Sequence, residues 1–468
     1  MKTFTPPELD ESWPESAQAS HRQLTQQLQE SKKQIEQLTK AVDLLQRQLK
    51  LNSKTSSKPP STDKEKGKAR RKKRSSGRSK GGQKGHTGST RERLEPDEII
   101  VCEPQEERCA CGGEWIAREQ RSLLQVTDLP EIKPHVREYH RACFDCPDCG
   151  QSTYADSKLP LGDSHFGPRI HALVLDLSLS CRLSHRQIRD HLKRSFNIKV
   201  SIGTISSMIE RAGQFTKDVF KELKRWYQED EHPKHVDETG WRVQGERTQL
   251  IGSLNASAVI FQCSEKRKQP DVMRLIGDDL KQLIICDRAL VYHGWENRQL
   301  CWAHVLRDFY CLETYPVSRR QASALVKSAQ ALFKHFRAHQ QGSLSTEVYL
   351  KNARQLRTEI KAALQCLEKI EIAEKPDGMV RSLLKHEAKL WTFLDHPSLC
   401  IHNNLQESAL RPLVIKRKLS FGNDTPEGAD RLAQLMSVIE TLKRQGRDVL
   451  SWLVACFEGQ PTSLIPSR

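Results

Sequence analysis

The 468-residue sequence has few apolar and aromatic side chains, which make up 37% and 6% of it. No run approaches the roughly 18 consecutive apolar residues that a membrane-spanning helix needs. The first residues are polar and acidic, whereas a secretory signal is basic and then apolar. These absences exclude a helical membrane protein, and we expect a cytoplasmic protein in which a sizeable segment stays outside any packed core.

Acidic residues are fewer than basic ones: the chain has 59 Asp and Glu and 75 Lys and Arg, which gives a net charge of +16. Such an excess favours a polyanionic partner, nucleic acid first, over the pocket of an ordinary metabolite enzyme. The length corresponds to about three domains of typical size. We therefore expect a multidomain protein that is associated with the nucleoid.

From His21 to Leu51 the sequence contains neither Gly nor Pro, and apolar residues recur in alternating steps of three and four. This spacing predicts a coiled coil over 19–51 and hence a homo-oligomer. A single amphipathic helix lying on another domain is the alternative.

A basic linker is predicted over 52–94, because Ser, Lys, Gly and Pro interrupt every periodicity there. Between Lys64 and Lys84 it has eleven Lys or Arg and one acid, Glu65. Such an arm gains affinity for phosphates by counterion release, although it could also be only a solvated spacer. The residues expected to contact DNA are Arg70, Arg71, Lys72, Lys73 and Arg74.

Six cysteines fall within 95–160, and four of them form two close pairs, Cys109 with Cys111 and Cys146 with Cys149. Each pair is followed by glycine, which suits a turn that carries thiolates. The stretch 122–142 predicts two short strands that would bring the pairs together as one structural zinc site. Cys102 and Cys143 are substitute ligands, and buried reduced thiols or a redox pair are the alternatives.

Three short helices are predicted over 168–181, 184–196 and 201–212, within a DNA-binding helix-turn-helix domain over 161–228. Thr204, Ser207 and Arg211 are expected to point outward from the third helix. Trihelical cores that bind no DNA are common, so this pattern alone is not specific. The expected core consists of Ile188, Leu192, Ile198, Val200, Ile202, Ile205 and Ile209.

Beyond Pro233 the pattern changes to strands, at 234–237, 241–243, 250–254 and 258–263, with a turn at Thr239–Gly240. A helix over 271–280 leads to the apolar run 283–287, which predicts an interior strand parallel to the first. This is the opening of a ribonuclease H-like sheet. In that topology Asp237 and Asp287 lie close together and can bind magnesium.

Glu407 is the best candidate for a third carboxylate, and Arg411 follows one helical turn later, suited to a phosphate. Asn404 as N-cap with Glu407 three residues on is also a capping box, which needs no catalysis. Cys301 and His304 are spaced like half a metal site, but we expect them to be packing residues behind Asp287.

Long stretches of the sequence resemble the large transposase of the insertion-sequence-66 family, a group of DDE transposases. The stretches are NSKTSSKPPS from Asn52, GGQKGH from Gly81, the cysteine pairs, HVDETGWRV from His235, the span from CDRA at Cys286 to CWAHVLRDF ending at Phe309, and NNLQESALRPLV from Asn403 with Arg417 and Lys418.

The resemblance implies that Asp237, Asp287 and Glu407 are the catalytic acids and hold two Mg2+ or Mn2+ ions. It implies a ribonuclease H-like catalytic domain over 229–458 with a helical insertion over about 312–396. The expected fold is thus multidomain α/β: coiled coil, zinc module, helix-turn-helix and catalytic core.

The activity so implied is DNA cleavage and strand transfer on transposon-end and target DNA, with Arg417 and Lys418 as further DNA contacts and accessory proteins of the same element as further partners. Two alternatives remain at this point: a noncatalytic repressor derived from a transposase, and a ribonuclease H-like nuclease that cuts without joining.

Overall fold

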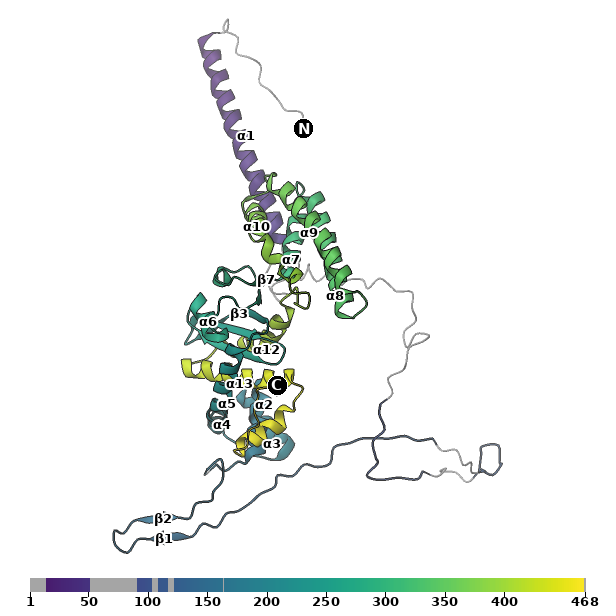
Figure 1. Ribbon diagram of the computed structural model, residues 1–468, viewed down its shortest axis with the longest axis vertical. Coiled ribbons are helices and arrows are strands. Elements are labelled where there is room, and N and C mark those ends of the chain that lie inside the picture. Colours follow the sequence, from purple (N-terminus) through teal and green to yellow (C-terminus); the bar gives the residue numbers. More distant parts are fainter. Residues whose placement is uncertain (1–13, 51–90, 103–107, 117–121, 163, 467–468) are drawn as a thin grey trace. The chain divides into compact units, whose positions relative to one another are not determined.

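The computed structural model describes residues 14–50, 91–102, 108–116, 122–162 and 164–466, and its helices and strands are shown in Figure 1. The residues Arg70, Arg71, Lys72, Lys73 and Arg74 lie outside these ranges. The chain forms two compact units. The first comprises Met1–Lys68, Ser157–His185 and Gly203–Arg468, and the second comprises Ala69–Asp156 and Arg186–Ile202.

Helix α1 spans Glu15–Lys50 without interruption. Leu24, Ile35 and Leu38 on this helix are exposed, each by more than 60%. Exposed apolar side chains at coiled-coil spacing are consistent with pairing between chains. Self-association stays a prediction.

In the second unit, strand β1 (Cys143–Asp145) pairs antiparallel with β2 (Ser152–Tyr154) around the second cysteine pair. The prediction of two strands within 122–142 was wrong, because these residues form no strand. Pro130 and Pro134 explain the difference, since proline cannot donate to a strand ladder and interrupts the alternation of faces.

Four helices precede the large sheet: α2 (Pro168–Leu179), α3 (His185–Phe196), α4 (Ile202–Phe215) and α5 (Lys217–Glu229). Of the expected trihelical core, Ile188, Leu192 and Ile205 are buried, whereas Ile202 is exposed. The boundary between the two units falls between α3 and α4. The helices thus lie where the sequence predicted them, and the helix-turn-helix itself stays a prediction.

The sheet of the first unit has the strand order β5-β4-β3-β6-β7. The bounds are β3 Lys234–Val243, β4 Glu246–Leu254, β5 Val259–Ser264, β6 Ile284–Cys286 and β7 Arg298–Leu300. β3, β4 and β5 are antiparallel, and β6 runs parallel to both β3 and β7. The expectation that the strand predicted at 283–287 runs parallel to the first strand is therefore confirmed.

The expected turn at Thr239–Gly240 was wrong, because β3 continues through it to Val243. The hairpin turns instead at Gln244 and Gly245, whose φ angles are both positive, at 53° and 80°. Two successive residues with positive φ form the tight turn that matches the twist of a hairpin. The longer strand extends the sheet beyond Asp237.

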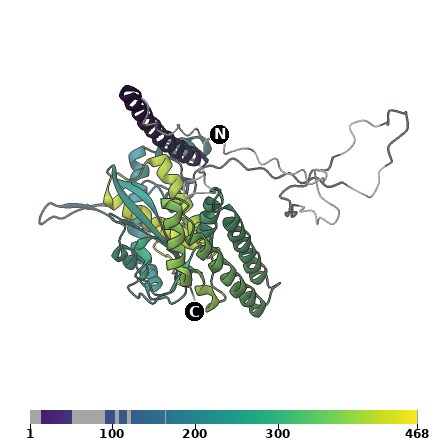
Figure 2. The same ribbon diagram turned by 90° about the horizontal axis from the view of Figure 1, so that it is seen from above.

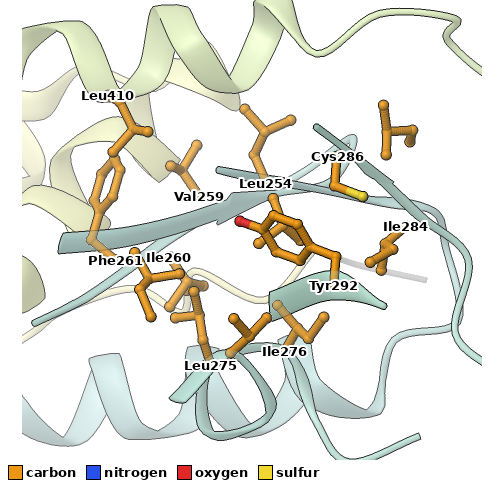
Figure 3. Packing of buried hydrophobic residues seen from close by; sticks show 14 of the residues in the cluster. Leu254, Val259, Ile260, Phe261, Leu275, Ile276, Ile284, Cys286, Tyr292 and Leu410 are labelled. Atoms are coloured by element: carbon orange, nitrogen blue, oxygen red, sulfur yellow. The ribbon is translucent and has the colours of Figure 1, made fainter. Parts of the chain in front are cut away.

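Helices cover both faces of the sheet. α6 (Gln269–Ile276) packs on one face and α12 (Asn404–Ser420) on the other, and α13 (Pro426–Arg444) runs along the edge strand β5. Figure 3 shows Phe261 and Leu410 on the side of α12, and Leu275 and Ile276 on the opposite side. Thr441 and Ser437 of α13 accept hydrogen bonds from the backbone N–H groups of Val259 and Phe261, at 3.0 and 2.8 Å. Side chains of α13 thus bond backbone N–H groups that the edge strand β5 would otherwise leave unpaired.

Helices interrupt the chain between the sheet and α12, as expected from the sequence. α7 (Trp302–Glu313) leads to α8 (Arg319–Gln340) and α9 (Thr346–Glu368), which lie side by side in Figures 1 and 2. α10 (Glu374–Lys385) and the short α11 (Glu387–Leu390) follow, while α14 (Val449–Phe457) packs against α2. Among the helices described here, none is long and apolar enough to cross a membrane.

Gly252 of β4 lies opposite Asp237 of β3, and a Cβ atom there would meet Gln406 Nε2 at 2.3 Å and the Phe261 ring at 2.9 Å. Overpacking of this kind costs about 1–3 kcal/mol. We expect Gly252→Ala to lower the free energy of unfolding by that amount in urea titrations. Gly378 in α10 is the matched control, because nothing lies within 4 Å of its Cβ position and alanine favours a helix. Equal stability of the two variants would contradict the close packing at Gly252.

Candidate catalytic site

Two aspartates lie level with each other on neighbouring parallel strands. In the register of β3 and β6, His235 pairs with Ile285, and two residues further along each chain are Asp237 and Asp287. Parallel strands run about 4.8 Å apart. The register therefore places both carboxyl groups at the same end of the sheet, as the sequence predicted.

Asn403 attaches the start of α12 to β3. Its Nδ2 donates to the carbonyl of Val236 at 2.8 Å, and its Oδ1 lies 3.0 Å from His235 Nδ1. Since Oδ1 can only accept, His235 carries its proton on Nδ1. Burial lowers the pKa of His235 to about 4, so the ring is neutral. This buried contact fixes the first turn of α12, and with it Glu407, beside Asp237.

Glu407 does not form the capping box that the sequence allowed. The N-cap of α12 is Asn403, and no side-chain hydrogen bond caps the helix. Glu407 Oε1 instead lies 3.3 Å from Arg307 Nη2 and 3.8 Å from His304 Nε2. The expectation that His304 is a packing residue was wrong, because its ring faces this carboxylate. Arg307 was missed, although its position one helical turn after His304 was visible in the sequence.

The charge of Glu407 also acts on Asp237. Burial, followed by the charges of Asp287 and Glu407, raises the pKa of Asp237 to about 8, against the opposing effect of Arg267 and Arg307. A carboxyl group whose pKa is raised by the charges of two others lies in one poorly neutralised space with them. All three predicted acids therefore contribute to one electrostatic site.

Glu238 follows Asp237 but points to the other face of the strand. It is paired with Arg267 and accepts a hydrogen bond from Tyr292, and its side chain is 5% exposed. These contacts neutralise Glu238 and separate it from the three acids.

Hard oxygen donors with unbalanced negative charge suit Mg2+ or Mn2+. Within the described ranges, however, no three His, Cys, Asp or Glu side chains are grouped closely enough to hold one metal ion. Glu407 is turned toward Arg307 and His304. Asp237 and Asp287 supply oxygen donors of the kind that such an ion prefers, whereas Glu407 is paired with Arg307.

The predicted zinc ligands form two separate turns. The backbone N–H of Cys109 donates to Gly113 at 2.8 Å, and that of Cys146 donates to Gln151 at 2.8 Å. Hydrogen bonds from backbone N–H groups lower the pKa of Cys111 and of Cys146, which favours their thiolates. Cys149 is the second cysteine of the second pair. Within the described residues, the four predicted ligands do not come together as one metal site. Residues 122–142, which were expected to form the strands that join the two cysteine pairs, form no strand.

The side chains predicted to contact DNA differ in how far they are exposed. Ser207, Arg411 and Lys418 are exposed, and Thr204 is half-buried. Arg211 was expected to point outward, but it is half-buried and its Nη1 donates to the carbonyl of Leu161 at 3.3 Å.

Arg417 also differs from the expectation of a DNA contact. Its Nη1 donates to Thr239 Oγ1 at 3.0 Å and to the carbonyl of Gly240. Arg417 thus holds the far end of β3 against α12.

The raised pKa of Asp237 predicts how the stability of the metal-free chain changes with pH. The folded chain keeps the Asp237 proton up to about pH 8, whereas the unfolded chain loses it near pH 4. Stability from this proton is present below about pH 4 and is lost as the pH rises to about 8. In urea titrations with EDTA, Asp237→Asn should lose less stability than the wild type between about pH 5 and pH 8.

Asp218 is the matched control, because its side chain is 91% exposed and only Lys221 lies near it. Asp218→Asn should keep the wild-type slope of stability against pH. If Asp237→Asn also kept that slope, Asp237 would be an ordinary ionised carboxylate.

Comparisons with known proteins identify the family of the chain. The family model described as "Transposase IS66 family" matches residues 163–431, and a family of unknown function, DUF6444, matches residues 5–92. An uncharacterized protein of Sinorhizobium fredii, y4qI, is 29% identical over 165 residues, which are 33% of this chain and 29% of that relative. The first match contains all three acids and more than half of the sequence. The chain belongs to the IS66 family of transposases.

Proposed function

We propose that this protein binds the terminal repeats of a transposon, cleaves the DNA at each end and joins the freed ends to target DNA. The observation that carries the proposal is the level placement of Asp237 and Asp287 on parallel strands, with Glu407 acting on the same space. Strand order and the helical insertion support a ribonuclease H-like core. Membership of the IS66 family supports a DNA-processing reaction.

The proposed reaction has two displacements at phosphorus. Water first attacks a phosphodiester at the transposon end, and the bond to the 3′ oxygen breaks to leave a free 3′ hydroxyl. That hydroxyl then attacks a phosphodiester of target DNA, loses its proton and displaces a target 3′ oxygen, which takes up a proton. No covalent bond to the protein forms in either step.

Asp237, Asp287 and Glu407 are the residues proposed to hold two Mg2+ or Mn2+ ions. When bound, such ions supply Lewis acidity that activates the attacking oxygen and stabilises the leaving one. For this, Asp237 must release the proton that its raised pKa retains. Arg307 and His304 contact Glu407 in the metal-free site. When Glu407 binds metal instead, both side chains would be available to contact the negative charge of the substrate.

The remaining parts are proposed to hold DNA and to pair the ends. The candidates for phosphate contact are the basic linker 52–94 and the exposed side chains of Arg411 and Lys418, and Thr204 and Ser207 would contact DNA from α4. The coiled coil of α1 would join two copies into one complex, and accessory proteins of the same element would assist. The exposed apolar side chains of α1 support this pairing.

A structural zinc ion is proposed for Cys109, Cys111, Cys146 and Cys149. Both pairs already form glycine-containing turns with lowered thiol pKa values, so metal binding would supply the energy that brings them together. Metal analysis of the purified chain tests this, since Cys146→Ser should lose the zinc and the exposed Cys366→Ser on α9 should keep it.

Glu407→Gln separates catalysis from structure, because glutamine has nearly the same shape but is a poor ligand for magnesium. We expect cleavage and strand transfer of labelled end DNA to fall by more than about 100-fold, since even the partners of metal ligands contribute about 10–100-fold. Thermal stability and binding of end DNA should be unchanged.

Glu347→Gln is the matched control, as Glu347 also lies in the first turn of a helix but is exposed. It should keep full activity. Full strand transfer by Glu407→Gln would disprove the role of Glu407. Metal-dependent cutting without joined product would instead identify a nuclease, and binding without cutting by the wild type would identify a repressor.

A further inference from the structure

A group of cationic side chains lies close to the catalytic acids but takes no part in binding them. It consists of Arg288, His293, Arg298, Lys385 and His386, which we call the basic cluster. The rings of His293 and His386 lie 4.8 Å apart. Strand β7 supplies Arg298, and α11, whose N-cap is His386, packs against β7.

Several hydrogen-bond donors in the basic cluster have no acceptor. Arg298 is 5% exposed, yet in the described part of the chain its Nε and Nη1 have no partner. The same is true of Arg288 Nη1. Unpaired donors on a buried charge are costly, so a site that keeps them is suited to an acceptor from outside the chain.

The nearby acids are already paired. Asp308 pairs with Nη2 of Arg288, and Glu387, which follows His386, forms two bonds of 2.8 and 2.9 Å to Arg357. Arg298 and Lys385 both lower the pKa of His293. Asp308 thus neutralises part of the charge of Arg288, whereas the unpaired Nε and Nη1 atoms of Arg298 meet no carboxylate among the described residues.

The basic cluster reaches both the surface and the catalytic acids. Lys385 is exposed and His386 is half-buried, so an anion can approach from solvent. Arg288 follows Asp287 directly, and its charge acts on His304 at the acids as well as on His386 in the cluster.

We propose that the basic cluster binds a phosphate group of the DNA backbone and so positions the strand that enters the catalytic acids. The proposal rests on the proposed function for its choice of DNA as the source of the phosphate. Planar guanidinium groups with several N–H donors suit this ligand, and the exposed ammonium group of Lys385 adds a further positive charge.

Arg298→Met tests the proposal in the full-length chain. Methionine removes the buried charge and its unpaired donors, so the variant should be at least as stable as the wild type in chloride buffer. Inorganic phosphate at constant ionic strength should raise the Tm of the wild type in a saturable way. It should raise the Tm of Arg298→Met clearly less.

The matched control is Arg354→Met, which removes an exposed arginine from α9. Its Tm should respond to phosphate as the wild type does, which removes general salt effects. If Arg298→Met lowers stability too far to measure, His386→Gln takes its place with the same expectation. A phosphate response equal to the wild type in these variants would overturn the proposal.

A second readout identifies the source of the phosphate. For a DNA duplex, the slope of log K against log salt should become shallower by about one in Arg298→Met and stay unchanged in Arg354→Met. Loss of the phosphate response with an unchanged slope would mean that the cluster binds a free anion, and the assignment to DNA would be wrong. Neither readout requires cleavage, so each stands or fails separately from the proposed reaction.

Discussion

The site depends on one electrostatic constraint: two carboxyl groups held level on adjacent parallel strands repel each other in a buried space. The register of β3 and β6 brings Asp237 and Asp287 to the same end of the sheet, and burial raises the pKa of Asp237 to about 8. A fold keeps such an arrangement at a cost to its stability. The repulsion is removed by a proton without metal, or by a divalent cation that both groups can share.

The surrounding residues maintain this constraint. Asn403, buried and bonded to both His235 and Val236, holds the start of α12 so that Glu407 acts on the same space. Glu238, the nearest other acid, is neutralised by Arg267 and Tyr292 on the opposite face. Arg307 and His304 hold Glu407 without removing its effect on Asp237. The basic cluster, to which Arg288 belongs, is proposed to bind a phosphate group of the DNA backbone.

The sequence predicted those features that follow from local pattern. Alternating apolar strands and a crossover helix were sufficient to place Asp287 beside Asp237, because parallel pairing after a crossover leaves few topologies. The roles of Asn403 and Arg307 were not predictable, since each depends on a contact with a residue about 100 or more positions away. Arg417 and Arg211 were misassigned for the same reason, because a basic side chain bonded to a distant carbonyl has the same sequence signal as an exposed one. The strands expected in 122–142 failed because Pro130 and Pro134 outweigh the surrounding β-formers.

The central claim is that Asp237 and Asp287 together bind a divalent cation. A crystal structure of the chain with Mn2+ and end DNA, with anomalous scattering recorded for manganese, tests it most directly. The account predicts an anomalous peak between the carboxylates of Asp237 and Asp287, with Glu407 rotated away from Arg307. A well-ordered site without manganese between these two residues, or a peak bound by other side chains, would contradict it.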